Sequence, residues 1–187
     1  MSALIEAAKA TDYPAEIVLV VANRPHAGGL ATAKAAGIAT TIVDHVVYED
    51  RAAFDAALDK TLQAHGIDLI CLAGFLRMLT PQFVERWRGR MINVHPALLP
   101  QFKGLHTHAR ALTAGVKTHG ATVHFVSAEV DSGPVIMQAS VPVHDSDTEE
   151  SLGARVLAEE HRIYPEALRR LTDGKVSIDG AIPSESR

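Results

Sequence analysis

Residues 91–100 read MINVHPALLP, an apolar run that stops against a proline. Side chains alternate between the two faces of a strand, so Asn93 and His95 are expected to point the same way. Pro96 has no N–H for a β-ladder, and the strand is predicted to end there. In an open α/β sheet, ligands bind beyond the carboxyl ends of the parallel strands, where this pair would lie. The spacing leaves open an alternative, in which loop backbone satisfies a strand-end amide and histidine.

The rest of the chain alternates strand-like and helix-like segments at the spacing of an α/β protein. Strands are expected at residues 15–23, 38–43, 67–75, 90–95, 120–126 and 133–143, and helices at 2–10, 28–37, 50–65, from 80, 107–115 and 148–172. The last two strands follow each other closely, with Asp, Ser and Gly between them, and are predicted to pair antiparallel. We therefore predict a Rossmann-like, doubly wound, mostly parallel sheet with an antiparallel C-terminal strand addition.

Length and composition indicate one globular domain, predicted at residues 1–178, with a flexible tail at 179–187. Of the 187 residues, 47% are apolar and 21% charged, and no apolar run approaches the ~18 residues of a membrane span. The net charge is −4 and the basic residues are scattered, which argues against nucleic acid as a partner. No secretory leader is visible, so we expect a cytoplasmic protein. The single cysteine, Cys71, is interpreted as a buried strand residue.

A second polar element is the segment EVDSGPVI, which contains Asp131. An isolated Asp before Ser and Gly is most simply a turn residue that bonds its own backbone. A carboxylate beside a histidine, however, orients the ring and raises its pKa by stabilising the imidazolium. An amide, an imidazole and a carboxylate together suit reactions in which a carbonyl oxygen gains negative charge.

Two further features suggest sites but are interpreted otherwise. Histidines are frequent, yet no Cys or carboxylate stands at a known ligand spacing and no H-E-x-x-H is present, so no metal is expected. The histidines considered are His106, His108, His119 and His124. Gly28 and Gly29 precede a predicted helix without a G-x-G-x-x-G motif, which favours a plain helix start over a phosphate site.

The segments AGFLRMLTPQFVERWRGRMINVHPALLPQFKGLHTHARAL and HGATVHFVSAEVDSGPVIMQASVPV, with EEHRIYP near the C-terminus, resemble the phosphoribosylglycinamide formyltransferases of purine biosynthesis. The resemblance runs from Ser2 to about Ile178. Formyltetrahydrofolate deformylases and methionyl-tRNA formyltransferases share the core, but FKGLHTHARAL is closer to the glycinamide ribonucleotide branch. The resemblance implies 10-formyltetrahydrofolate as cosubstrate, with its formyl group passing to the amine of glycinamide ribonucleotide.

The resemblance also implies the site residues. Asn93, His95 and Asp131 match the catalytic trio of the family. Asn93 and protonated His95 would donate hydrogen bonds to the oxyanion of the tetrahedral intermediate. Asp131 would keep His95 charged and help to move protons. Residues implied for the folate are Arg51, Leu76, Arg77, Met78, Leu79, Asn93, Ser127, Ala128, Glu129 and Val130. Residues implied for the ribonucleotide are Gly74, Pro96 and Glu160. Partners would be these two small molecules, with no membrane, and the protein would be a monomer or a homodimer.

One part of the family pattern is not matched. Its members begin with a strand and a Gly/Ser/Asn loop that holds the substrate phosphate, ahead of the helix that here reads SALIEAA. Either Met1 is an internal methionine of a longer enzyme, or the chain is genuinely shorter and binds the ribonucleotide weakly. Two alternatives to formyl transfer therefore stay open: hydrolysis of formyltetrahydrofolate, and an inactive folate-binding protein.

Overall fold

The computed structural model describes residues 1–180, and the predicted tail therefore lies mostly outside the described residues. The helices are α1 (Ser2–Ala7), α2 (Gly28–Ala35), α3 (Arg51–Ala64), α4 (Pro81–Arg86), α5 (Thr107–Thr113) and α6 (Glu149–Thr172), with a short 3₁₀ helix η1 (His45–Val47). The strands are β1 (Leu19–Ala22), β2 (Ala39–Ile42), β3 (Ile70–Leu72), β4 (Met91–His95), β5 (Thr118–Phe125) and β6 (Val135–Pro142). The α/β class and the antiparallel addition are confirmed.

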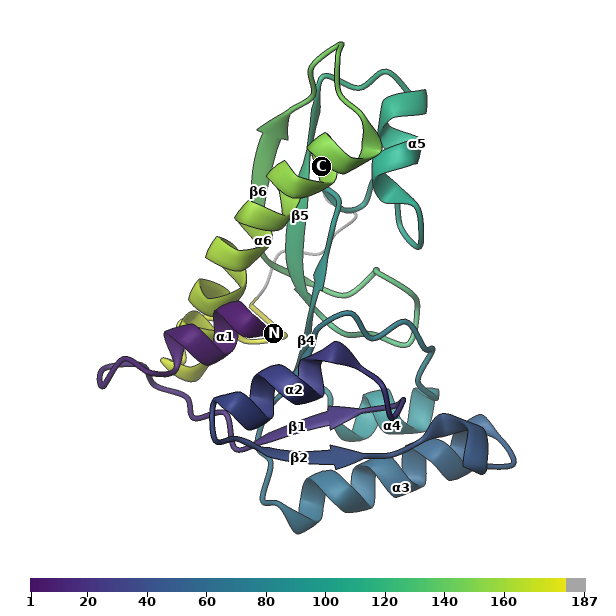
Figure 1. The fold of residues 1–187 in the computed structure, drawn as a ribbon, viewed down its shortest axis with the longest axis vertical. Coiled ribbons are helices and arrows are strands. Elements are labelled where there is room, and N and C mark those ends of the chain that lie inside the picture. Colours follow the sequence, from purple (N-terminus) through teal and green to yellow (C-terminus); the bar gives the residue numbers. More distant parts are fainter. Residues whose placement is uncertain (181–187) are drawn as a thin grey trace.

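The strands are hydrogen-bonded in two sheets (Figure 1). In one, β1 pairs parallel with β2; in the other, the order is β3-β4-β5-β6. The pairing of β3 with β4 is parallel, whereas β4 with β5 and β5 with β6 are antiparallel. Figure 1 shows β1 and β2 between α2 and α3, with the longer β5 and β6 lying beside α6. Because β4 has a partner on each side, it is an inner strand of the larger sheet.

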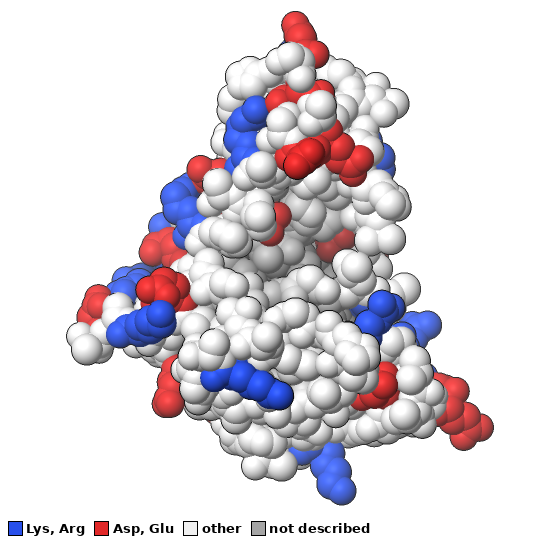
Figure 2. Space-filling view, in the orientation of Figure 1, with Lys and Arg blue, Asp and Glu red and all other residues white. Residues whose placement is uncertain are grey.

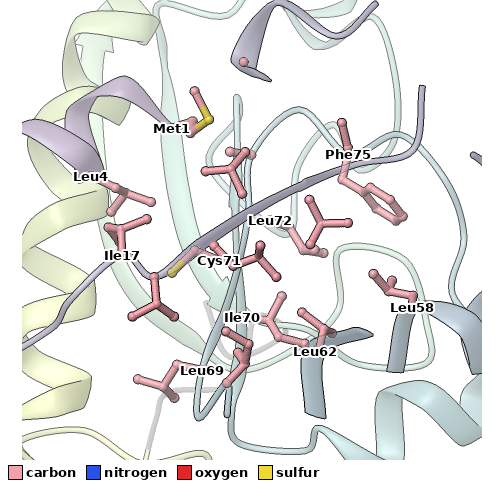
Figure 3. A pocket seen from close by; sticks show the side chains of 18 of the residues that line it. Met1, Leu4, Ile17, Leu58, Leu62, Leu69, Ile70, Cys71, Leu72 and Phe75 are labelled. Carbon is pink, nitrogen blue, oxygen red and sulfur yellow. The ribbon is translucent and has the colours of Figure 1, made fainter. Parts of the chain in front are cut away.

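A cavity of about 710 Å³ separates the two sheets. It is lined without interruption by residues 14–23 and 66–75, the segments that carry β1 and β3, and by apolar side chains of α1 and α3. Figure 3 shows Cys71 and Leu72 in this cavity, with Met1 and Leu4 at one side and Leu58 and Leu62 at the other. Burial raises the pKa of the Cys71 thiol to about 12, in keeping with its interpretation as a strand residue.

β1 and β3 are shorter than the predicted strands at residues 15–23 and 67–75. A strand extends only as far as its backbone is hydrogen-bonded to a neighbouring strand. Each of these two strands has such a neighbour on one side only. Residues 15–18 and 67–69, which precede the two strands beside the cavity, belong to no ladder. The apolar pattern correctly located the strands, but their length depends on partners that a local pattern does not contain.

Three of the α-helices in residues 1–180 start with a side-chain cap, which satisfies backbone N–H groups that have no partner within the helix. Asp50 accepts from Ala53 N at 2.8 Å and begins α3. Thr80 accepts from Phe83 N at 3.3 Å ahead of α4, and Thr148 begins α6 with a capping box. Within residues 1–180, no helix has the length and apolar character needed to cross a membrane.

Candidate active site

Asn93 and His95 lie in β4, two residues apart and on the same face, as the alternation predicts. Across the antiparallel pair, Asn93 is opposite His124 of β5, and His95 is opposite Thr122. His95 is 5% exposed and His124 is 2% exposed, so both rings are held within the packed sheet end. The segment after β5 brings Asp131 to the same place.

The four polar side chains form one connected cluster. The Nδ1 atom of His95 is 3.3 Å from Oδ2 of Asp131. The Nε2 atom of His124 is 3.6 Å from the other carboxylate oxygen of Asp131 and 3.3 Å from Nδ2 of Asn93. The structure therefore brings together the amide, the imidazole and the carboxylate predicted from the sequence, and adds a second imidazole between two of them.

Asp131 is held at the site by backbone geometry as well as by contacts. Its φ is 51°, in the left-handed region that non-glycine residues seldom adopt. Its Oδ2 atom accepts a 2.8 Å hydrogen bond from Gly104 N. Burial by itself raises the pKa of Asp131, but the neighbouring His124 ring, the hydrogen bond from Gly104 and the charge of His95 outweigh it and lower that pKa. The residue is thus an ionised site carboxylate and more than a turn residue.

His95 has a protein oxygen at each ring nitrogen. Nε2 lies 3.0 Å from the carbonyl oxygen of Phe102, and Nδ1 faces Asp131. Burial lowers the pKa of His95 and outweighs the raising effects of Asp131 and of the Phe102 carbonyl. Asp131 does raise the pKa of His95, as expected, but the net shift is downward because desolvation of the ring is the larger effect. Protonation on both nitrogens would nevertheless satisfy both acceptors.

The loop that follows β4 is fastened to the sheet by two polar side chains. The Thr122 hydroxyl donates to Ala97 O at 2.6 Å and accepts from Leu99 N at 3.0 Å. Gln138 of β6 donates to Leu99 O and to Thr122 Oγ1, each at 2.9 Å. These bonds hold the backbone behind the Phe102 carbonyl, which is the acceptor that His95 faces.

Most of the residues implied for the folate lie in the segments that follow β3 and β5. Leu76 is 81% exposed and Met78 is 57% exposed, in the segment directly after β3. Phe54 joins this segment to the one after β2, because Arg77 lies 5.3 Å from its ring centroid and Tyr48 packs edge-on against it. Arg51, Leu79 and the loop residues Ser127, Ala128, Glu129 and Val130 complete the set on these elements. Their contact with a folate is a prediction.

The structure also presents residues that the sequence interpretation missed. Val46 and Val47 of η1 are each 71% exposed, and their segment leads into the same Tyr48–Phe54 contact. Lys103 donates to Ser132 Oγ at 2.6 Å, directly after Asp131. The feature of the sequence that could have indicated the valines is an apolar pair between Asp44 and Asp50 that belongs to no predicted helix or strand.

Of the residues implied for the ribonucleotide, Gly74 lies two residues after the end of β3 and Pro96 directly follows β4. Gly74 has a φ of 68°, which its lack of a side chain permits. Glu160 comes from α6, and burial raises the pKa of its carboxyl group. Figure 2 shows that this face is hollowed between the β1–β2 part and the β5–β6 part, with acidic side chains visible in the hollow.

The cavity between the sheets is a different place from the polar cluster. Gly74 and Leu79 line it, whereas none of Asn93, His95 and Asp131 does. Among residues 1–180, no group of three or more His, Cys, Asp or Glu side chains is arranged to hold a metal ion. The chemistry of the cluster is that of an amide donor with two imidazoles and a carboxylate.

This fold and cluster define the class of the protein. The sequence pattern of the family described as "Formyl transferase" matches residues 1–168. The chain belongs to the formyl transferase family.

Similar proteins include phosphoribosylglycinamide formyltransferases and trifunctional purine biosynthetic proteins. Phosphoribosylglycinamide formyltransferase of Escherichia coli is 42% identical over 178 residues, which are 95% of this chain and 84% of that protein. The trifunctional purine biosynthetic protein adenosine-3 of Bos taurus is 45% identical over 178 residues, but this chain spans only 18% of it. The crystal structure of glycinamide ribonucleotide transformylase 1 from Symbiobacterium toebii superposes with a TM-score of 0.94 at 45% identity, covering 98% of this chain and 86% of that one. The Brucella melitensis phosphoribosylglycinamide formyltransferase structure has a TM-score of 0.89 at 50% identity, with 94% and 91% covered.

Proposed function

We propose that this protein transfers the formyl group of 10-formyltetrahydrofolate to the amine of 5′-phosphoribosylglycinamide. The observation that carries the proposal is the cluster at the end of β4, in which His95 lies 3.3 Å from Asp131 and Asn93 is linked to Asp131 through the ring of His124. The family membership and the names of its relatives support the reaction. The residue roles below are part of the proposal.

The reaction begins when the amine of the ribonucleotide attacks the formyl carbon. The carbonyl π pair moves to oxygen, giving a tetrahedral intermediate with an oxyanion and a positively charged nitrogen. Asn93 donates an amide N–H to this oxyanion. Asp131, ionised before the reaction, relays a proton through a water from the attacking nitrogen to N10 of the folate. The C–N10 bond then breaks, releasing tetrahydrofolate and the formylated amine.

His95 enters this sequence through its protonation. A neutral ring has one N–H for two acceptors, Asp131 and the Phe102 carbonyl. A negative oxygen nearby favours the imidazolium, because opposite charges stabilise each other strongly in a water-poor site. The protonated ring then stabilises the oxyanion, and donation to it directly requires that Nε2 exchange the Phe102 carbonyl for the substrate oxygen. Asp131 keeps the ring oriented during that exchange.

The exposed apolar side chains supply a surface for the flat ring system of the folate. Leu76 and Met78 on one loop and Val46 and Val47 on another are all more than half exposed. Backbone groups of the loops after β3 and β5, with Arg51 at the start of α3, would meet the polar edges. We further propose that Gly74, Pro96 and Glu160 contact the ribonucleotide.

Transfer is tested with Asn93→Ala. Loss of one oxyanion donor is expected to lower kcat by about 10²–10³-fold, because such donors act mainly on the transition state. The measurement is the rate at which the ribonucleotide gains the mass of a formyl group. Gln63→Ala, which removes an exposed amide from α3, is the control and should leave the rate unchanged.

The same assay separates the alternatives. Formate release without any amine, dependent on His95, would show a hydrolase instead. Folate binding with neither transfer nor release would show an inactive binding protein. We also propose a cytoplasmic monomer or homodimer, for which light scattering of the purified chain measures the mass.

A further inference from the structure

We propose that His124 is a positioning residue: its ring fixes which way the Asn93 amide faces. The inference rests on the formyl-transfer function proposed above. The juxtaposition that carries it is Nε2 of His124 at 3.3 Å from Nδ2 of Asn93, between two strands whose register places these residues opposite each other.

The backbone determines where His124 carries its proton. Nδ1 lies 2.8 Å from the carbonyl oxygen of Phe125. A carbonyl oxygen only accepts hydrogen bonds, so Nδ1 is the N–H nitrogen. In the neutral ring the other nitrogen, Nε2, is then a lone-pair acceptor. The ring is 2% exposed, so water does not compete for this nitrogen.

An acceptor at Nε2 selects one of the two amide orientations of Asn93. The NH₂ end makes a hydrogen bond to the lone pair, whereas the Oδ1 end would face it with a second lone pair. The NH₂ group has two N–H bonds, and one stays available for the substrate. In the opposite orientation Asn93 would offer Oδ1 in place of that N–H, and a developing oxyanion would be repelled.

The lack of a side chain at Gly133 allows the Phe125 carbonyl to occupy the position that Nδ1 of His124 faces. A Cβ built on Gly133 would lie 1.8 Å from the oxygen of Phe125, so only glycine permits this approach. Phe125 N also donates to Pro134 O at 2.9 Å, which ties the two segments together. The same turn carries Asp131, whose nearer carboxylate oxygen is 3.6 Å from Nε2, too far for a good hydrogen bond. Asn93 is therefore the closer partner of Nε2.

Two substitutions of similar size separate positioning from packing. In His124→Asn the shorter amide can still donate to the Phe125 carbonyl, but no acceptor remains at the Nε2 position. In His124→Gln the longer amide places an acceptor oxygen near that position. We expect the Asn variant to lose about 10²-fold in kcat with little change in the KM for folate, and the Gln variant to recover most of that loss. His65→Asn, the same change at an exposed histidine, is the control.

A double variant tests whether His124 acts through Asn93. Combining His124→Asn with Asn93→Ala should cost no more than Asn93→Ala alone, since His124 acts through that amide. Equal losses in the Asn and Gln variants, or losses that multiply in the double variant, would overturn the proposal.

A spectroscopic readout separates this inference from the proposed function. Nitrogen-15 NMR of the protein without substrates should show His124 protonated on Nδ1 only, and the Asn93 NH₂ resonances should shift in His124→Asn. The opposite tautomer, or unshifted amide resonances, would overturn the inference whatever reaction the protein catalyses. An inactive protein with the expected spectra would instead contradict the proposed function alone.

Discussion

At the scale of single residues, His119 shows how burial sets protonation. It is 1% exposed, its ring packs edge-on against Phe102 with centroids 5.7 Å apart, and its Nε2 lies 3.3 Å from Nδ1 of His108. Burial, followed by the charge of His108, lowers its pKa to about 4. The folded protein therefore holds this ring neutral at pH values where an unfolded chain would protonate it.

The lowered pKa of His119 makes the folded protein less stable in acid. Between the unfolded pKa near 6.5 and the folded pKa near 4, the unfolded state binds more protons, so the free energy of unfolding falls as the pH falls. The loss is roughly 1.4 kcal/mol for each unit between the two values. His119→Gln, which does not titrate, should flatten the dependence measured by urea unfolding from pH 7 to pH 4. His161→Gln on the exposed face of α6 should not, and an unchanged slope in His119→Gln would contradict the prediction.

At the scale of elements, α6 has the most completely satisfied start. Thr148 accepts from Ser151 N at 3.2 Å while the Ser151 hydroxyl accepts from Thr148 N at 3.0 Å. Arg155 adds two contacts to Asp147, just ahead of the helix, at 2.8 and 2.9 Å. The first turn of the helix is thereby fixed against the end of β6.

Thr148→Ala removes this cap. The free energy of unfolding should fall by about 0.5–2 kcal/mol, because a backbone N–H of the first turn loses its acceptor. Thr32→Ala makes the same chemical change on the exposed surface of α2, where alanine is the better helix former, and should be neutral or slightly stabilising. Guanidinium unfolding of both variants measures the difference, and equal effects would show that the cap contributes nothing.

At the scale of the whole molecule, α6 connects parts of the chain that are far apart in sequence. The Tyr164 hydroxyl donates to Leu72 O at 2.7 Å and lies 3.1 Å from Ile92 O, which joins the helix to β3 and β4. Tyr164 is 3% exposed and belongs to the core formed by β5, β6 and α6. We propose on this basis that residues 1–178 unfold as one unit.

Tyr164→Phe tests that link. It removes the donor that contacts the carbonyl groups of Leu72 and Ile92. We expect a loss of about 1–3 kcal/mol in the free energy of unfolding, with a single transition retained. Tyr48→Phe is the control, since the Tyr48 hydroxyl makes no hydrogen bond within residues 1–180. Two separate transitions in the unaltered protein, seen by circular dichroism and by Trp87 fluorescence, would contradict the single unit.

Local sequence was sufficient for the order of elements and for part of the cluster. The strand alternation around Asn93 and His95, and the Asp or Thr caps of α3, α4 and α6, involve residues close in the chain, so their consequences are visible without a structure. The motif around Asp131 indicated the family, although its left-handed backbone was not evident from the residue type.

Tertiary structure alone decided the remaining features. The register of β4 against β5, which sets His124 opposite Asn93, is a contact between residues 31 positions apart. The direction in which the pKa of His95 shifts depends on how far folding removes the ring from water, and no sequence motif specifies that. The division of the strands into two sheets likewise depends on which backbone edges find partners. The sequence by itself determined which chemical groups are present and which element carries each, while only the folded chain decided how those groups face one another, because that depends on long-range pairing and burial.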